Sequence, residues 1–152
     1  MKRVEKISNL KLLEIINRLD FFRQFSIEER RILLEDRLEV YVCKKGFRVF
    51  REGEVDSTFY LLLSGRIQIM QKAGDRVLGV IGPGQFLGEG AFVTQAPRSA
   101  SAVAEEDSVL LRLDSKALRS LSAVIREKLK DAIIAGMARR IVHLNERLEA
   151  LE

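Results

Sequence analysis

The chain has 152 residues, of which 47% are hydrophobic and 32% charged, and its formal net charge is +4. This length favours one domain around one core, and the composition is typical of a soluble globular protein. The single Cys43 excludes an internal disulfide and a cysteine-ligated cluster, so we expect a reducing, cytoplasmic location. No apolar run reaches the ~18 residues that a membrane span needs, and we expect no membrane partner.

The excess of basic residues lies near the two ends. Residues 1–50 carry 12 basic and 8 acidic side chains and residues 116–152 carry 8 and 5, whereas residues 51–115 carry 6 and 9. Both ends read as helical, so solvated helix faces explain the excess better than a nucleic-acid surface does.

Residues 1–37 are predicted to form an N-terminal helical segment. Apolar side chains between residues 4 and 19 return at steps of three and four, which predicts a helix over that range. Ser26 and Glu29 have the spacing of a capping box, so a second helix is expected from Ile27 to about Arg37.

Residues 38–113 are predicted to be a β-domain, because the apolar period changes there to two. Short runs alternate with turns, and nine of the ten glycines and both prolines lie between Gly46 and Pro97. Many short strands separated by glycine turns are typical of an antiparallel barrel or jelly roll. The expected strands cover 38–43, 47–51, 58–63, 66–71, 77–81, 99–104 and 109–113.

Residues 114–152 are predicted to be C-terminal helices. Asp114 or Ser115 is the expected cap of a short helix, and a long helix follows from about Ala123 to the end. Its last part repeats apolar residues at coiled-coil spacing. Two explanations stay open: the stripe is the seam of a homodimer, or it packs on the chain's own barrel or its N-terminal helices. The stripe consists of Ile134, Met137, Ile141, Leu144, Leu148 and Leu151.

The stretch from Gly88 to Ser101 has the residue types of an anion-binding loop. Its first glycine lets the backbone approach a ligand, and the free N–H groups around Gly90 and Ala91 suit a phosphate oxygen. Arg98 offers a planar fork of donors that matches phosphate oxygens, and Ser99 adds a hydroxyl.

Glu89 in the same stretch suits a ribose hydroxyl rather than a phosphate, because an ionised carboxylate only accepts hydrogen bonds. Two alternatives stay open. Glu89 is favoured in a first helical turn by the helix dipole alone, and Arg98 is also explained as a rim arginine paired to Glu89. The combination of residues at this spacing favours a binding loop.

Residues 86–91 (Phe-Leu-Gly-Glu-Gly-Ala) and 97–102 (Pro-Arg-Ser-Ala-Ser-Ala) resemble the phosphate-binding cassette of cyclic nucleotide-binding domains. These domains occur in catabolite-activator-type regulators, protein kinase A regulatory subunits and cyclic nucleotide-gated channels. The resemblance extends to residues 50–53 and 57–65 and covers most of the chain. It implies a mainly β fold with flanking helices: an eight-stranded antiparallel jelly-roll β-barrel with N-terminal helices and a long C-terminal helix.

The resemblance also implies roles for the matching residues. Arg98 would bind the cyclic phosphate, Glu89 the ribose 2′-hydroxyl, and Gly88 and Ala91 would give backbone contacts. Serine at position 99 occurs in cAMP-binding bacterial regulators of the family, which favours cAMP over cGMP. The implied ligand-binding residues are Gly88, Glu89, Gly90, Ala91, Arg98, Ser99 and Ala100.

The base of the nucleotide needs walls and a lid. By analogy with the family, Val49, Leu61 or Val77 would wall the base, and the long helix would close over it. Among its residues the candidates for the lid are Met137, Arg139 and Arg140.

The predicted function is therefore a cyclic nucleotide sensor in bacterial-type signal transduction, with no enzyme activity, cofactor or metal. His143 is the only histidine, which argues against a jelly-roll metal site. Two departures from the family matter: Gly90 replaces a bulky apolar residue, and no helix-turn-helix follows the long helix, so no direct DNA binding is expected. The alternatives are a non-sensing assembly module and an N-terminal fragment of a catabolite-activator-type transcription regulator.

Overall fold

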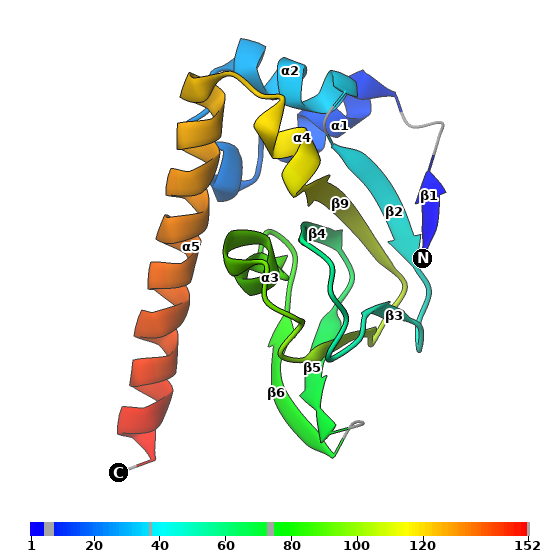
Figure 1. The fold of residues 1–152 in the computed structure, drawn as a ribbon, viewed down its shortest axis with the longest axis vertical. Helices are drawn as coiled ribbons and strands as arrows, with labels where there is room; N and C mark the ends of the chain where they lie inside the picture. The colour runs from blue at the N-terminus through cyan, green and yellow to red at the C-terminus, as the bar shows by residue number, and fades with distance from the viewer. Residues whose placement is uncertain (5–7, 37, 73–74, 152) are drawn as a thin grey trace.

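Two antiparallel sheets face each other and helices from both ends of the chain pack beside them (Figure 1). The structure is a computed structural model that describes residues 1–4, 8–36, 38–72 and 75–151. The five-stranded sheet has the order β1-β2-β9-β4-β7 and the four-stranded sheet the order β3-β8-β5-β6. Strands β2 to β9 form the predicted eight-stranded jelly roll, and β1 is an additional strand.

The strands are β1 (Lys2–Val4), β2 (Glu39–Cys43), β3 (Arg48–Phe50), β4 (Thr58–Ser64), β5 (Ile67–Gln71), β6 (Arg76–Ile81), β7 (Phe86–Leu87), β8 (Ser101–Ala104) and β9 (Ser108–Asp114). The helices are α1 (Asn9–Ile16), the 3-10 helix η1 (Asp20–Phe22), α2 (Ile27–Asp36), α3 (Glu89–Thr94), α4 (Ser115–Arg119) and α5 (Ala123–Ala150).

The five-stranded sheet is covered on both faces, so the molecule has two apolar clusters. Along β4, Phe59 and Leu61 point into a cluster shared with the helices, whereas Tyr60 and Leu62 point into the cluster between the sheets. A strand that is buried on both faces has no polar positions to alternate with apolar ones. This explains why residues 58–63 read as a continuous apolar run.

The N-terminal segment differs from the prediction. The helix expected over residues 4–19 is shorter, because α1 covers only Asn9–Ile16. Residues Lys2–Val4 instead form β1, which pairs with the otherwise open edge of β2. Pairing with a distant strand thus overrides the local helical period at Val4. The end of the second helix expected at Arg37 lies outside the described residues, as does part of the turn expected at 73–75.

The predicted capping signals are confirmed. The Ser26 N–H donates to Glu29 Oε1 at 2.8 Å and the Glu29 N–H donates to Ser26 Oγ at 3.2 Å, which is a capping box at the start of α2. Asp114, rather than Ser115, caps α4 by accepting from the Ala117 N–H at 2.7 Å. Ser122 caps α5 in the same way through the Ile125 N–H.

Helix α5 is buried only at its beginning. Ile125, Leu129 and Ile133 join the cluster formed with the N-terminal helices. The distal part runs beside the barrel (Figure 1) with its apolar stripe in solvent, so the alternative in which this stripe packs on the chain's own barrel does not hold. The exposed side chains are those of Ile134, Met137, Ile141, Leu144, Leu148 and Leu151.

Candidate functional site

The seven residues predicted to bind a ligand line one cavity of about 250 Å³. The cavity lies between the segment that joins β7 to β8, the four-stranded sheet and one residue of α5, Arg140. The predicted residues that share it are Gly88, Glu89, Gly90, Ala91, Arg98, Ser99 and Ala100.

Gly88 brings the backbone unusually close to Arg98. It precedes α3 with φ at +82°, a conformation that side-chain-bearing residues rarely adopt. A Cβ at this position would lie 2.6 Å from Arg98 Nη1 and 3.2 Å from the Thr58 carbonyl oxygen. Because no side chain intervenes, the Gly88 carbonyl accepts a hydrogen bond from Arg98 Nη1 at 2.9 Å.

Arg98 is buried, with only 3% of its surface exposed. Its Nη2 donates to the Thr58 carbonyl at 2.8 Å and to Thr58 Oγ1 at 3.0 Å, and its guanidinium carbon lies 4.3 Å from the centre of the Phe50 ring. Asp56 Oδ2 lies 3.4 Å from Nη2. The Nε atom is also buried, yet it has no hydrogen-bond partner among the described residues. The guanidinium is therefore fixed in orientation while one donor stays available.

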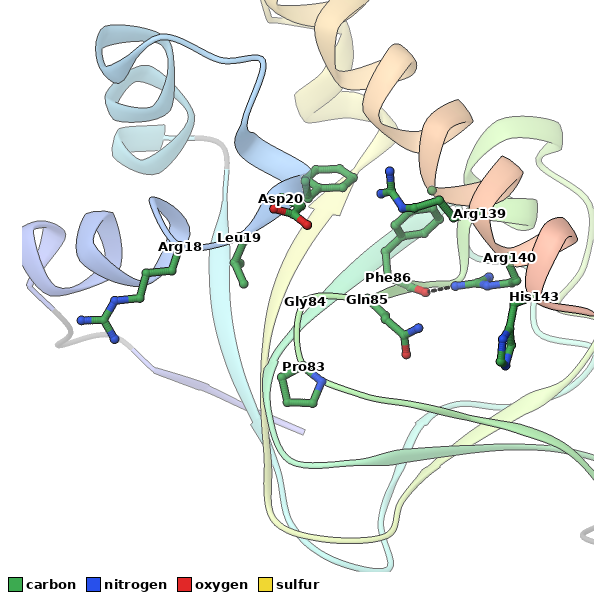
Figure 2. A pocket seen from close by; sticks show the side chains of 12 residues that line it. Arg18, Leu19, Asp20, Pro83, Gly84, Gln85, Phe86, Arg139, Arg140 and His143 are labelled. Carbon is green, nitrogen blue, oxygen red and sulfur yellow. Dashed lines mark hydrogen bonds between the residues drawn. The ribbon is translucent and has the colours of Figure 1, made fainter.

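Glu89 forms an ion pair with Arg140 of α5 and not with Arg98. The same guanidinium donates through Nη2 to the Phe86 carbonyl at 2.6 Å, a bond that Figure 2 shows as a dashed line. The alternative in which Arg98 pairs with Glu89 is therefore wrong. The arginine that pairs with Glu89 is Arg140, 51 residues further along the chain. The carboxylate predicted to meet a ribose is engaged by the helix predicted to be the lid.

Helix α5 comes this close to β7 because residue 136 is a glycine. A Cβ on Gly136 would overlap the ring of Phe86. One turn later, Arg140 lies over the same ring at 5.2 Å and reaches the cavity. Of the three predicted lid residues, Arg140 lines this cavity, whereas Met137 and Arg139 do not.

The apolar walls differ from those predicted. None of Val49, Leu61 and Val77 lines the cavity. Leu61 belongs to the cluster on the helix side of its sheet, and Val77 is exposed. The actual apolar lining consists of Phe50, Ile69, Leu78, Ile81 and Leu87.

Two of these differences are single-residue shifts. Phe50 takes the place expected for Val49, and Leu78 that expected for Val77. In a strand, neighbouring residues face opposite sides, so a pattern of apolar residues alone does not decide which one faces inward. At Leu78 the register itself shifts, because Ile69 pairs with Gly79 and Met70 with Val77. Such an irregularity redirects side chains.

Gly90 is exposed, and a Cβ there would meet nothing within 4 Å. The apolar contact between α3 and the core is instead made by Phe92, whose ring centre lies 4.8 Å from that of Phe59. Phe59 in turn contacts Phe86 and Phe21 at 6.4 and 6.1 Å. A continuous aromatic cluster therefore joins α3 to η1, although position 90 itself carries no side chain.

Within the described ranges, His, Cys, Asp and Glu side chains form no cluster of three or more that would suit a metal ion. His143 is exposed on α5, as predicted for a surface histidine. None of the helices in the same ranges combines the length and apolar character needed to cross a bilayer. Burial raises the pKa of the Cys43 thiol, so this side chain is a poor nucleophile.

Comparison with known proteins gives a consistent result. The family model of the cyclic nucleotide-binding domain matches residues 42–123. A CRP-like cAMP-activated global transcriptional regulator of Mycobacterium tuberculosis is 30% identical over 142 residues, which are 91% of this chain and 62% of the relative. Human cGMP-dependent protein kinase 2 is 31% identical over 99 residues, which are 59% of this chain and 13% of the kinase. The chain thus spans less than two thirds of either relative.

Among solved structures, a cyclic nucleotide-binding domain from Methylobacillus flagellatus superimposes with a TM-score of 0.79. The alignment covers 94% of this chain and 83% of that structure at 24% identity. At this identity the likeness establishes the fold alone.

Proposed function

Because the chain belongs to the family of cyclic nucleotide-binding domains, which are regulatory domains, we propose that it binds cyclic AMP in the cavity around Arg98. Arg98 holds the cyclic phosphate together with the Ser99 hydroxyl. Glu89 accepts a hydrogen bond from the ribose 2′-hydroxyl. The base lies against Ile69 and Leu78, and Arg140 of α5 borders the cavity through its pair with Glu89.

The observation that carries this proposal is the state of Arg98. A buried guanidinium is costly unless its charge and its donors are satisfied. Its carboxylate neighbour Asp56 lies at 3.4 Å, and Nε has no partner among the described residues. An anion in the adjoining cavity supplies the missing hydrogen-bond partner of Nε. A cyclic phosphate fits because it presents oxygens to Arg98 while its ribose reaches Glu89.

The preference for cAMP rests on Ser99, which lines the cavity. In the resembling family, serine here accompanies cAMP in bacterial regulators and threonine accompanies cGMP in kinases. The mycobacterial relative is described as cAMP-activated, which favours the same nucleotide. We therefore expect tighter binding of cAMP than of cGMP, and a shift toward cGMP in Ser99→Thr.

Isothermal titration calorimetry with cAMP, cGMP and 5′-AMP tests the proposal. Wild type should bind cAMP most tightly and 5′-AMP poorly. Arg98→Lys keeps the charge but loses the planar fork, so its affinity for cAMP should fall by at least about tenfold, in line with roughly 1.5–3 kcal/mol for a hydrogen bond to a charged group. Because Arg98 also supports the fold, the melting temperature of each variant is the control for integrity.

The role of Glu89 has a sharper test. Wild type should bind 2′-deoxy-cAMP, which lacks the 2′-hydroxyl, more weakly than cAMP. Glu89→Gln should bind the two ligands with nearly equal affinity. Equal losses in both proteins would show that Glu89 does not meet the ribose. Absence of heat with every cyclic nucleotide, in a folded protein, would refute the proposed function as a whole.

The exposed apolar stripe on α5 supports a second, compatible role in self-association. A contiguous apolar stripe in solvent marks an interaction surface, and the heptad spacing suits a parallel pair of helices. We propose a homodimer through Ile134, Met137, Ile141, Leu144, Leu148 and Leu151. If cyclic nucleotides do not bind, assembly through this helix is the remaining candidate function.

A further inference from the structure

A second cavity, of about 420 Å³, lies on the other side of Arg140 and is larger than the cavity around Arg98. It is bounded by the junction of α1 and η1, by the loop that joins β6 to β7, and by α5 (Figure 2). The proposed binding of a cyclic nucleotide makes no use of this cleft. Its volume falls within the range of small-molecule sites, which is roughly 300–1,000 Å³.

The lining of the cleft is strongly basic. Arg139, Arg140 and His143 lie within one turn of α5, and Arg18 borders the opposite side. The only acidic side chain in the lining, Asp20, pairs with Arg23 at 2.8 Å. Among the described residues, neither Arg139 nor His143 has a hydrogen bond or ion pair. The cleft therefore combines positive charge with unused donors.

Gln85 adds a neutral donor to the same end of the cleft. Its Oε1 accepts from the Gly82 N–H at 2.7 Å, which fixes the amide and leaves its N–H₂ group for a ligand. Figure 2 shows Gln85, Arg140 and His143 gathered around one end of the cleft, with the Phe86 ring beside them. Arg18 and Arg139 turn their guanidinium groups away from this end. The donors thus converge from two elements that the fold brings together.

We infer that this cleft is a second ligand site, which takes a small phosphorylated molecule. Arginine forks match phosphate oxygens two at a time, and His143 and Gln85 add single donors. The apolar floor formed by Leu19 and Phe86 accommodates the carbon part of such a ligand.

Arg140 connects this site to the cavity around Arg98, because it lines both. It is paired to Glu89 on one side, so a phosphate in the cleft and the Glu89 carboxylate compete for one guanidinium. A phosphate that draws Arg140 away leaves Glu89 free to accept the ribose hydroxyl. This coupling, which rests on the proposed function, makes the phosphorylated ligand tighten cyclic nucleotide binding, and linkage requires the reverse effect as well.

Calorimetric titration of the full chain with pyrophosphate, at constant ionic strength and without nucleotide, tests the site itself. Arg140→Gln and His143→Gln should each weaken pyrophosphate binding by at least about fivefold, as expected when a hydrogen bond to a charged ligand is lost. Arg18→Gln is the matched control: it removes a charge from the same cleft, but from a side chain that points away, and should change the affinity less than twofold. None of the three side chains is buried, so the fold should tolerate each change.

Three results would overturn the inference: no measurable binding of pyrophosphate, equal losses in all three variants, or a loss confined to Arg98→Lys. Equal losses would indicate general attraction to a basic surface, and the last result would place the anion in the Arg98 cavity. The coupling is measured by titrating cAMP with saturating pyrophosphate present. The Kd should fall at least about fivefold in wild type and stay unchanged in Arg140→Gln, within the usual range of coupling energies.

The two proposals fail separately. Pyrophosphate binding without cAMP binding would refute the proposed function and retain the second site. The opposite result would refute the second site alone. If both ligands bind and cAMP affinity does not rise, the competition for Arg140 is refuted while both sites stand.

Discussion

At the scale of single residues, the site depends on a glycine as much as on its charged groups. Gly88 has a positive φ and lies so close to Arg98 and to the Thr58 carbonyl that a methyl group has no room. Arg98 in turn is fixed by Gly88 and Thr58. Gly88 is therefore needed for the orientation of the arginine as well as for the turn into α3.

Gly88→Ala should destabilise the protein by about 1–3 kcal/mol, because it combines a strained backbone with displacement of Arg98. Gly90→Ala is the control, since it adds the same methyl two residues later, within α3 and in open space. It should be neutral or stabilising by up to about 1 kcal/mol through helix propensity. Urea unfolding measures both, and equal effects of the two changes would contradict the role given to Gly88.

The sequence predicts which charged residues belong to the candidate site, but it does not predict how they pair. The types and spacing of Glu89 and Arg98 indicate an anion and a hydroxyl. Glu89 pairs with Arg140 because of the rotation of α5 about its own axis. The sequence does not show which of the adjacent Arg139 and Arg140 faces the site. Only the packing of α5 on Phe86 decides between them.

At the scale of elements, the contact between α5 and β7 determines how the helix meets the site. Gly136 lies against the ring of Phe86, and Arg140 follows one turn later over the same ring. A glycine inside a helix costs roughly 1 kcal/mol relative to alanine. Here that cost is offset by the close approach of the helix to the sheet.

Gly136→Ala should therefore destabilise the protein by about 1–3 kcal/mol, as overpacking does, despite its gain in helix propensity. In a Phe86→Leu background, which removes part of the ring, the same change should cost at least about 1 kcal/mol less. A double-mutant cycle of unfolding free energies measures this coupling, and additive effects would contradict it.

A second contact ties α5 to α2. Lys128 Nζ lies 2.6 Å from Glu29 Oε1, and the Ser26 N–H donates to the same oxygen. The hydrogen bond from Lys128, followed by that from the Ser26 backbone, lowers the pKa of Glu29 below its ordinary value of 4.5. The stabilisation is therefore complete above that value and is lost as the pH falls through the lower pKa of the folded state.

Unfolding free energies measured by urea between pH 7 and pH 3 should fall less steeply in Glu29→Gln than in wild type below about pH 4.5. The matched control is Glu28→Gln, whose carboxylate pairs with Arg31 at 3.5 Å in an exposed position. This control should change the free energy of unfolding by at most about 1 kcal/mol, as for an exposed ion pair. A Glu29 variant with an unchanged slope would show that the pair does not contribute.

The elements that the sequence predicts well are those with a clear local period. The strands with regular apolar runs and both capped helices, α2 and α5, appear within a few residues of the expected positions. Strand β7 was not predicted, because its two residues have no period and form a strand only by pairing with Tyr60 and Leu61 of β4. The apolar walls were shifted by one residue for a similar reason: the inward face is set by pairing across the sheet.

At the scale of the whole molecule, the two apolar clusters stabilise different parts of the structure. The cluster between the sheets supports the cavity around Arg98, while the cluster on the helix side holds α5 at its beginning. The distal part of α5 belongs to neither. Its apolar side chains are therefore free to contact a second copy of the chain.

Leu144→Glu should convert a dimer into a monomer without lowering the melting temperature of the barrel, because Leu144 is 46% exposed and lies in the stripe. Val142→Glu is the matched control: Val142 is 56% exposed on the same helix but lies outside the heptad positions. Sedimentation velocity should show a dimer for wild type and for Val142→Glu. A monomer in all three cases would contradict the proposed dimer.

The absence of a side chain at Gly136 has a mechanical consequence. From this point to Ala150 the helix continues for 14 residues, or about 21 Å at 1.5 Å per residue. If α5 pivots at its contact with Phe86, Gly136 lies at the pivot and Arg140 lies one turn beyond it. A tilt of about 10° at Gly136 would move the C-terminal end of the helix by about 4 Å over that length. A change at Arg140 too small to alter the barrel would thus be magnified at the far end of the helix.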